Sequence, residues 1–171
     1  MADSRPDRVE RVKVRRAGVA DAQAFHFVML EAGRAGMDPR SSWHRTSLED
    51  VQYGLAHHGG FVAQQAEAVG AEIVGVVGHR PYGEFLTLNK LAVLPAWQGR
   101  GVARRLVSAV EQEARARGFG RVLLAVSQLN LAVVPLYQKL GYAVDASARY
   151  PFAAPDSPPP VVLTRALEVR A

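Results

Sequence analysis

The segment PAWQGRGVARRLV, residues 95–107, places two glycines directly before a helical pattern. Glycine loses more backbone entropy on folding than any other residue, so its use here needs a reason. The first turn of a helix offers free N–H groups and a partial positive charge, and small residues let an anion approach them. The segment therefore predicts a phosphate-binding turn with donors from Gly99 to Ala103, or a tight strand-to-helix turn that needs glycine.

The same segment excludes two common phosphate-binding loops. It lacks the GxxxxGK[ST] pattern of a Walker loop. It also lacks the GxGxxG pattern followed, about 20 residues later, by the acidic residue of a dinucleotide-binding fold. Arg100, Arg104 and Arg105 add positive charge next to the turn.

Hydrophobic periodicity divides the chain into strands and helices. Strands are expected at residues 9–16, 61–65, 72–79, 85–94 and 121–126, from Gly141 onward, and at 161–167. Helices are expected from 22 to 33 or 36, from a capping box at Thr46–Glu49 to about 59, at 99–117 and at 130–140. Pro81-Tyr82-Gly83 reads as a turn, and Glu111 and Glu113 are expected on the solvent face of the long helix.

This order of elements predicts a mixed α+β fold. A helix that joins two strands usually makes a parallel crossover, and hairpins make the remaining pairs antiparallel. We therefore expect a mostly antiparallel central sheet with one parallel crossover and helices on both faces. Residues 1–8 are expected to be a flexible lead, and residues 9–171 a single domain.

Composition narrows the partners and the compartment. The chain has 171 residues, a formal net charge of +5 and no cysteine, which excludes disulfides and thiolate metal sites. No apolar run has membrane length, and the charged start MADSRPDRVERVKVRR lacks a signal-like apolar region, so a cytoplasmic protein without a membrane partner is expected. The arginines do not cluster with aromatic residues, so a nucleic-acid partner is not expected.

Two blocks of the chain resemble motifs of the GNAT superfamily, the acetyl-CoA-dependent N-acetyltransferases. LNKLAVLPAWQGRGVARRLV resembles motif A, which reads Arg or Gln, two residues, Gly, one residue, Gly or Ala. LLAVSQLNLAVVPLYQKLGY resembles motif B through Asn130, Leu136-Tyr137 and Gly141-Tyr142. The order of strands and helices is similar to that of the family from Val9 to Leu167, so the resemblance implies a GNAT-like fold over nearly the whole chain.

The resemblance implies how acetyl-CoA would be held. The fourth strand is expected to carry a bulge and to splay from the fifth, so that pantetheine pairs with the backbone of Leu91, Ala92 and Val93. The diphosphate is expected at Gln98, Gly99, Arg100, Gly101, Val102 and Ala103, with Arg104 nearby. Asn130 is expected to contact the cofactor, although an Asn before a helix is also a common N-cap.

Acyl transfer to an amine requires that the amine lose a proton and that the departing thiolate gain one. Tyr137 matches the general acid of the family. Family members often carry a Glu base on the fourth strand, but here that strand reads TLNK. Several sources of the base stay open: a water held by Thr87 and Asn89, an acceptor that arrives deprotonated, or one of Glu84, His79 and Glu31, of which we favour Glu84.

Other candidates concern the acceptor. The resemblance implies an acceptor pocket near Trp43, Tyr82 and Asn89, with Met37 and Asp38 as further contacts. The histidines lack a metal-ligand spacing, so no metal is expected. Pro135 predicts that the helix around it begins near Val134 or is irregular before that residue.

The leading hypothesis is an N-acetyltransferase. It would move an acetyl group from acetyl-CoA to a primary amine of a small molecule or peptide, by direct attack in a ternary complex. The alternative is a non-catalytic acyl-CoA-binding module or sensor, which the missing strand carboxylate keeps open. The resemblance also makes a homodimer an expectation, with contacts through the last strands and the PFAAPDSPPP loop.

Overall fold

A seven-stranded sheet runs through the part of the chain that the computed structural model describes, residues 11–66 and 71–168. Its strands lie in the order β1-β2-β3-β4-β5-β7-β6. They are β1 (Val12–Arg16), β2 (Gly60–Gln65), β3 (Ile73–Tyr82), β4 (Phe85–Val93), β5 (Arg121–Val126), β6 (Ala143–Val144) and β7 (Val161–Ala166). Only β4 and β5 are parallel among these pairs, which confirms the predicted crossover.

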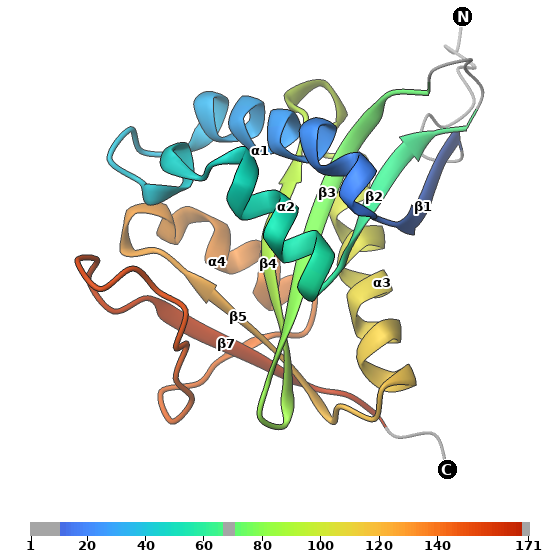
Figure 1. Ribbon diagram of the computed structural model, residues 1–171. Helices are drawn as coiled ribbons and strands as arrows, with labels where there is room; N and C mark the ends of the chain where they lie inside the picture. Colours follow the sequence, from blue (N-terminus) through green and yellow to red (C-terminus); the bar gives the residue numbers. More distant parts are fainter. Residues whose placement is uncertain (1–10, 67–70, 169–171) are drawn as a thin grey trace, which may run out of the picture.

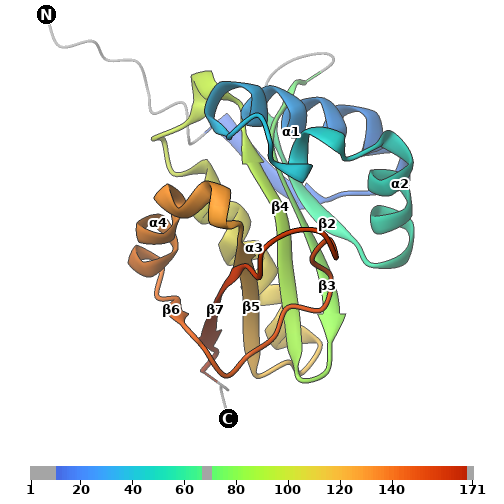
Figure 2. The same cartoon turned by 90° about the vertical axis from the view of Figure 1, so that its left-hand side faces the viewer.

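Helices cover both faces of this sheet (Figures 1 and 2). Helices α1 (Ala22–Gly36) and α2 (Leu48–His57) lie on one face, and α3 (Val102–Ala116) and α4 (Val134–Lys139) lie on the other. Neighbouring residues of β2 bury side chains on opposite faces: Val62 packs with α1 and α2, whereas Phe61 and Ala63 pack with α3. The predicted α+β fold is therefore confirmed, with an apolar core on each side of the sheet.

Several predicted boundaries change. The cap of α2 is Ser47, whose hydroxyl accepts from Asp50 N at 3.0 Å while the Asp50 carboxylate accepts from Ser47 N, so the capping box lies one residue later than predicted. Strand β3 continues through Tyr82, so the turn is at Gly83, which has φ 55°, and not at Pro81. The predicted flexible lead, residues 1–8, lies outside the described residues.

The prediction for two carboxylates of α3 is wrong. Glu111 and Glu113 are buried, each 6% exposed, because arginines from other elements reach them. Glu111 pairs with Arg165 of β7 at 2.7 Å, and Glu113 pairs with Arg16 at 2.6 Å and Arg117 at 2.7 Å. A carboxylate can be buried when it is paired and hydrogen-bonded, so these residues join α3 to both ends of the sheet.

Strand β4 has the two irregularities that matter for the site. The register with β3 shifts between Gly78, opposite Asn89, and Val76, opposite Ala92, so β4 carries one extra residue there. Lys90 lies in this bulge with φ 52°. Beyond Leu88 the ladder between β4 and β5 ends, and the two strands separate. The expected bulge and splay are both present.

No helix among the described residues combines the length and the apolar character that crossing a membrane would require.

Candidate functional site

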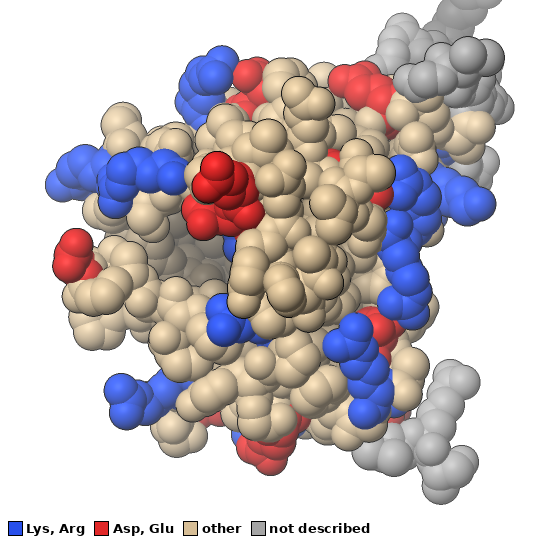
Figure 3. Space-filling model, in the orientation of Figure 1, with Lys and Arg blue, Asp and Glu red and all other residues tan. Residues whose placement is uncertain are grey.

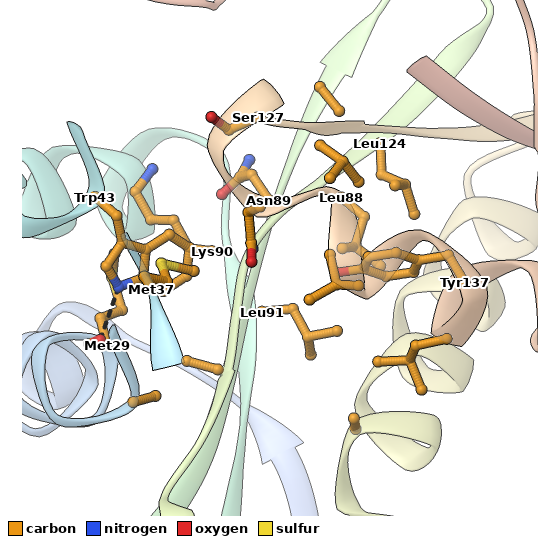
Figure 4. Close-up of a pocket in the computed structure, with 18 of the residues that line it drawn as sticks. Met29, Met37, Trp43, Leu88, Asn89, Lys90, Leu91, Leu124, Ser127 and Tyr137 are labelled. Carbon is orange, nitrogen blue, oxygen red and sulfur yellow. Dashed lines mark hydrogen bonds between the residues drawn. The ribbon is translucent and has the colours of Figure 1, made fainter. Parts of the chain in front are cut away.

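A pocket of about 790 Å³ lies where β4 and β5 separate. It is lined by β4, the turn before α3, α4, the end of α1 and its following loop, and the segment before β7. In the space-filling view this face is visibly hollowed (Figure 3). Strand β4 divides the lining side chains into two groups: Met37, Trp43 and Lys90 lie on one side, and Leu124 and Tyr137 on the other (Figure 4).

The turn before α3 forms one end of the pocket. Gly99 and Gly101 have φ 73° and 82°, a conformation that strongly favours glycine, so both glycines are needed for the turn itself. A side chain at either position would meet no protein atom within 4 Å, so the space in front of the backbone is open. The geometry of the turn thus explains both glycines, and the anion site stays a prediction. The turn has a tight geometry, and it leaves room for an anion at the start of a 15-residue helix.

Of the polar side chains around this turn, one holds the turn in place, one lines the pocket and one lies outside it. Gln98 donates from Nε2 to Val93 O at 3.0 Å, which ties the turn to the end of β4. Arg104, the third residue of α3, is exposed and lines the pocket together with Val102 and Ala103. Arg100 does not line it: its guanidinium lies 5.8 Å from the centre of the Trp97 ring.

The second wall is the open edge of β4. Leu91, Ala92 and Val93 line the pocket beyond the last residue paired with β5. Backbone N–H and C=O groups at such an edge need a partner, which a ligand with amide groups can supply. The edge and the turn before α3 line the same pocket, so one extended ligand could bind to both.

Tyr137 of α4 faces this edge. Figure 4 shows its ring pointing toward Leu88 and Leu91 of β4. The ring packs edge-to-face on Tyr142 with centroids 6.3 Å apart. Burial raises the pKa of Tyr137 to about 12, so its hydroxyl keeps its proton at neutral pH and can donate it. Helix α4 begins at Val134 with Pro135 in its first turn, as predicted.

Asn130 lines the same pocket from the 3₁₀ segment η5 (Gln128–Val133). Its backbone, with φ −136°, is not helical, and the caps are Ser127 for η5 and Val133 for α4. Asn130 is therefore not a helix cap. An N-cap role therefore does not explain why Asn stands here, and the residue lines the pocket.

On the other side of β4, glycines make room for polar and aromatic side chains. A Cβ on Gly78 would collide with Asn89 Oδ1, and one on Gly33 would lie 2.6 Å from Trp43 Cδ1. Trp43 donates from Nε1 to Met29 O at 2.7 Å, drawn as a dashed line in Figure 4. Lys90 lines the pocket, and burial lowers its pKa.

Several predicted residues are not brought to this pocket. Glu84 lies in the exposed β3–β4 turn, 3.8 Å from Arg121, and the rise of a strand places it about 20 Å along β4 from the Leu91–Val93 edge. Tyr82 is at the same end of the sheet and contacts Phe152 edge-to-face at 5.9 Å. Thr87 is buried and donates to Arg80 O at 2.7 Å, and Glu31 pairs with Arg34 at 2.9 Å.

The structure adds residues that sequence reasoning missed. The segment before β7 folds back so that Tyr150 and Phe152 also line the pocket. Lys90 was missed because only its place in the bulge distinguishes it from other lysines. Among the described lining residues, none is Asp, Glu or His, and the charged ones are Lys90, Arg104 and Lys139. Within residues 11–66 and 71–168, no group of three or more His, Asp or Glu is placed to hold a metal ion.

These features fit a coenzyme A ester. The open strand edge matches the amide groups of pantetheine, and the glycine turn with Arg104 matches a diphosphate. An apolar stretch formed by Leu88, Leu91 and Leu124 lies beside Tyr137 and suits a thioester. The donor set requires no metal.

Comparison with known proteins agrees with this fit. Residues 29–142 match the family model described as the acetyltransferase (GNAT) family. An acetyltransferase of Pectobacterium atrosepticum is 38% identical over 76 residues, which are 44% of this chain and 50% of that protein. Human N-acetyltransferase 8B is 33% identical over 107 residues, covering 57% of this chain and 45% of that protein. The chain thus spans about half the length of these curated relatives, or less.

Solved structures show the same fold. A PaiA N-acetyltransferase from Thermoplasma acidophilum in complex with coenzyme A superposes with a TM-score of 0.71, 15% identity, and coverage of 91% of this chain and 99% of that chain. The ribosomal-protein-S18-alanine N-acetyltransferase of Escherichia coli gives a TM-score of 0.68 at 17% identity, covering 94% of this chain and 96% of that chain.

Proposed function

Because this chain belongs to the GNAT family of acetyltransferases, and so is an acyltransferase, we propose that it transfers an acetyl group from acetyl-CoA to a primary amine. The amine attacks directly while both substrates are bound. One observation carries the proposal: the open edge of β4 and the glycine turn at the start of α3 line the same pocket, with only the short 3₁₀ segment Pro95–Trp97 between them in the chain. Acetyl-CoA supplies the acetyl group as an activated thioester.

The turn before α3 binds the diphosphate. Backbone N–H groups from Gly99 to Ala103 donate to it, and the helix dipole and Arg104 contribute positive charge. Gln98 holds the turn against Val93 O, so these donors are in place before the ligand arrives. Arg100, which stacks on Trp97, contributes charge from outside the pocket.

The edge of β4 positions the reacting end. Backbone groups of Leu91, Ala92 and Val93 pair with pantetheine, and Asn130 contacts it from the opposite wall. Leu88, Leu91 and Leu124 exclude water around the thioester. This arrangement directs the acetyl carbon to the side of β4 on which Asn89 and Trp43 lie.

Tyr137 protonates the departing sulfur. When the amine nitrogen bonds to the acetyl carbon and the C–S bond breaks, the sulfur carries negative charge and takes the Tyr137 hydroxyl proton. The raised pKa of Tyr137 keeps that proton available in the resting protein. Solvent returns a proton to the phenolate after the products leave.

The amine loses its proton without a carboxylate in the pocket. Glu84 is too distant to act, and the described lining residues supply cations in place of acids. A cationic lining disfavours an ammonium group and so lowers the pKa of the acceptor amine, which then reacts in its neutral form. Asn89 and a water beside it accept hydrogen bonds from that amine, and once the N–C bond forms the nitrogen passes its extra proton to this water and on to solvent.

The proposal is tested by titrating the protein with acetyl-CoA in a calorimeter, with CoA and ADP as controls, and by measuring CoA release with a panel of amines. Micromolar binding together with amine-dependent CoA release is the expected result. Binding without release from any amine would favour a non-catalytic acyl-CoA sensor. Absence of binding would contradict the assignment of the turn and the strand edge.

The homodimer implied by the family resemblance stays a prediction. Sedimentation at micromolar concentration, with and without CoA, measures it directly.

A further inference from the structure

A second cavity, of about 320 Å³, lies beside the main pocket on the α2 side of the sheet. The two share Thr46, Asn89, Lys90, Tyr150 and Phe152 as lining residues. The bulge of β4 is therefore the boundary between them. An acceptor whose amine reaches Asn89 can extend its other end into the second cavity.

Two of the residues that line this cavity, His58 and His79, each have a buried ring nitrogen without a hydrogen-bond partner in the described part of the chain. His79 is 2% exposed, and its Nδ1 makes no hydrogen bond within the described chain. The same holds for His58 Nε2, which is also buried. Burial lowers the pKa of His79 to about 4, and burial together with Arg80 lowers that of His58, so both rings are neutral at pH 7. The His58 ring can therefore offer a hydrogen bond to a ligand in the cavity, whereas the His79 ring packs against Phe61, with centroids 5.8 Å apart, toward the α3 face of the sheet.

The charged groups of the cavity are Arg80, Lys90 and Asp50. The guanidinium carbon of Arg80 lies 3.7 Å from the centre of the Phe152 ring, which fixes its position, and no carboxylate within the described residues pairs with it. Asp50 is already engaged, because its carboxylate accepts from Ser47 N at 3.1 Å at the start of α2. The helix N-terminus offsets part of its charge.

These observations describe a small polar site in which Arg80 has no carboxylate partner among the described residues, and in which Lys90 is balanced in part by the charge of Asp50. An arginine held flat against an aromatic ring presents its N–H groups in a fixed fork, which matches a carboxylate. A site of this volume suits a small molecule better than a folded protein surface.

Resting on the proposed function, we propose that the acetyl acceptor is a small amine that also carries a carboxylate, that is, an amino acid or a close analogue. Its carboxylate binds Arg80 and its amine lies between Asn89 and the acetyl group. Lys90, at the boundary, faces both ends of such a molecule. It attracts the carboxylate and repels the ammonium form of the amine, so only the neutral amine reaches the acetyl carbon.

The test compares three acceptors with chains of equal length: an ω-amino acid, the n-alkylamine and the diamine. CoA release is measured with the unmodified protein and with Arg80→Gln, Arg80→Lys and Arg149→Gln. Arg149 is exposed, adjoins Tyr150 and lies outside both cavities, so it serves as the matched control. Thermal melts verify that each variant is folded.

We expect kcat/KM for the amino acid to exceed that for the alkylamine by about tenfold or more, as one charge-assisted contact requires. Arg80→Gln should abolish this preference and leave the alkylamine rate within about threefold. Arg80→Lys should keep part of the preference, and Arg149→Gln all of it. Equal rates for the three acceptors would overturn the inference. A preference for the diamine would also overturn it and would identify Asp50 as the anchor.

A binding measurement separates this inference from the proposed function. The amino acid and the alkylamine are titrated into the protein saturated with CoA. The inference is supported if the amino acid binds, the alkylamine does not, and Arg80→Gln loses the binding of the amino acid. This holds even if no CoA is released, and the proposed catalysis is then what fails. If CoA is released but the amino acid and the alkylamine bind with equal affinity, the inference is overturned and the proposed function stays intact.

Discussion

Gly78 of β3 lies opposite Asn89 of β4, and the Asn89 amide occupies the space that a side chain on Gly78 would fill. The two residues thus depend on each other. Asn89 can point into the boundary between the two cavities only because its partner on β3 has no Cβ.

We therefore expect Gly78→Ala to displace Asn89 and to lower kcat/KM for the acceptor by about tenfold or more, because small misplacements in a site cost rate steeply. Acetyl-CoA affinity, which depends on the other side of β4, should change little. Initial rates and calorimetry measure the two effects. Gly120→Ala, at a position with open space, is the control. Equal losses of acceptor turnover and cofactor affinity would contradict this separation of roles.

Tyr137→Phe keeps the ring that packs on Tyr142 and removes only the hydroxyl. If that hydroxyl protonates the sulfur, kcat falls by about 100-fold while acetyl-CoA binding is retained. The matched variant is Tyr142→Phe, which loses the hydrogen bond to Glu111 Oε2. It should cost about 2 kcal/mol of unfolding free energy, because the acceptor is a buried carboxylate, and leave kcat unchanged. A fully active Tyr137→Phe variant would remove Tyr137 from the mechanism.

Arg104 and Arg115 lie near opposite ends of α3, and both are exposed. Arg104→Glu replaces a cation at the helix N-terminus with an anion, which should raise the unfolding free energy by a few tenths to about 1 kcal/mol. The same change should weaken acetyl-CoA binding by about tenfold or more, because the diphosphate is repelled.

Arg115→Glu makes the identical charge change in the last turn. There it should lower the unfolding free energy and leave acetyl-CoA affinity alone. Denaturant unfolding measures the change in unfolding free energy of each variant, and calorimetry measures the change in its affinity for acetyl-CoA. Equal losses of affinity in both variants would mean that net charge, and not the turn before α3, attracts the cofactor.

His79 makes stability depend on pH. Its pKa falls from 6.5 to about 4 on folding, so between pH 6.5 and 4 the unfolded chain binds a proton at this residue and the folded chain does not. Stability from this residue is complete above pH 6.5 and is lost as the pH falls toward 4, by up to about 3 kcal/mol. Denaturant unfolding at several pH values should show this slope, and His79→Leu should flatten it.

Local features were predictable from the sequence because their causes are local. The glycines before α3, the start of α4 at Val134 and the crossover between β4 and β5 all follow from neighbouring residues. The burial of Glu111 could not be predicted, because its partner Arg165 is 54 residues away. The bulge at Lys90 depends on how β4 pairs with β3, which no pattern within β4 reveals.

The candidate base shows a different kind of error. Glu84 and the Leu91–Val93 edge belong to one strand, and the rise per residue already implied that they lie about 20 Å apart. The acidic residue was favoured for its chemistry alone. Conversely, Arg80 and Phe152 were overlooked because they meet only when the segment before β7 folds back over the sheet.

The walls of the two cavities differ in how much they contribute to the buried core. The side proposed to hold acetyl-CoA consists of β4, β5 and α3, whose residues also form the core. Residues 151–160, by contrast, include no buried residue, although several of them line the pocket. Substitutions and length changes in this segment can therefore accumulate at small cost to folding, and a new acceptor preference can evolve while the chemistry of the acetyl donor is inherited unchanged.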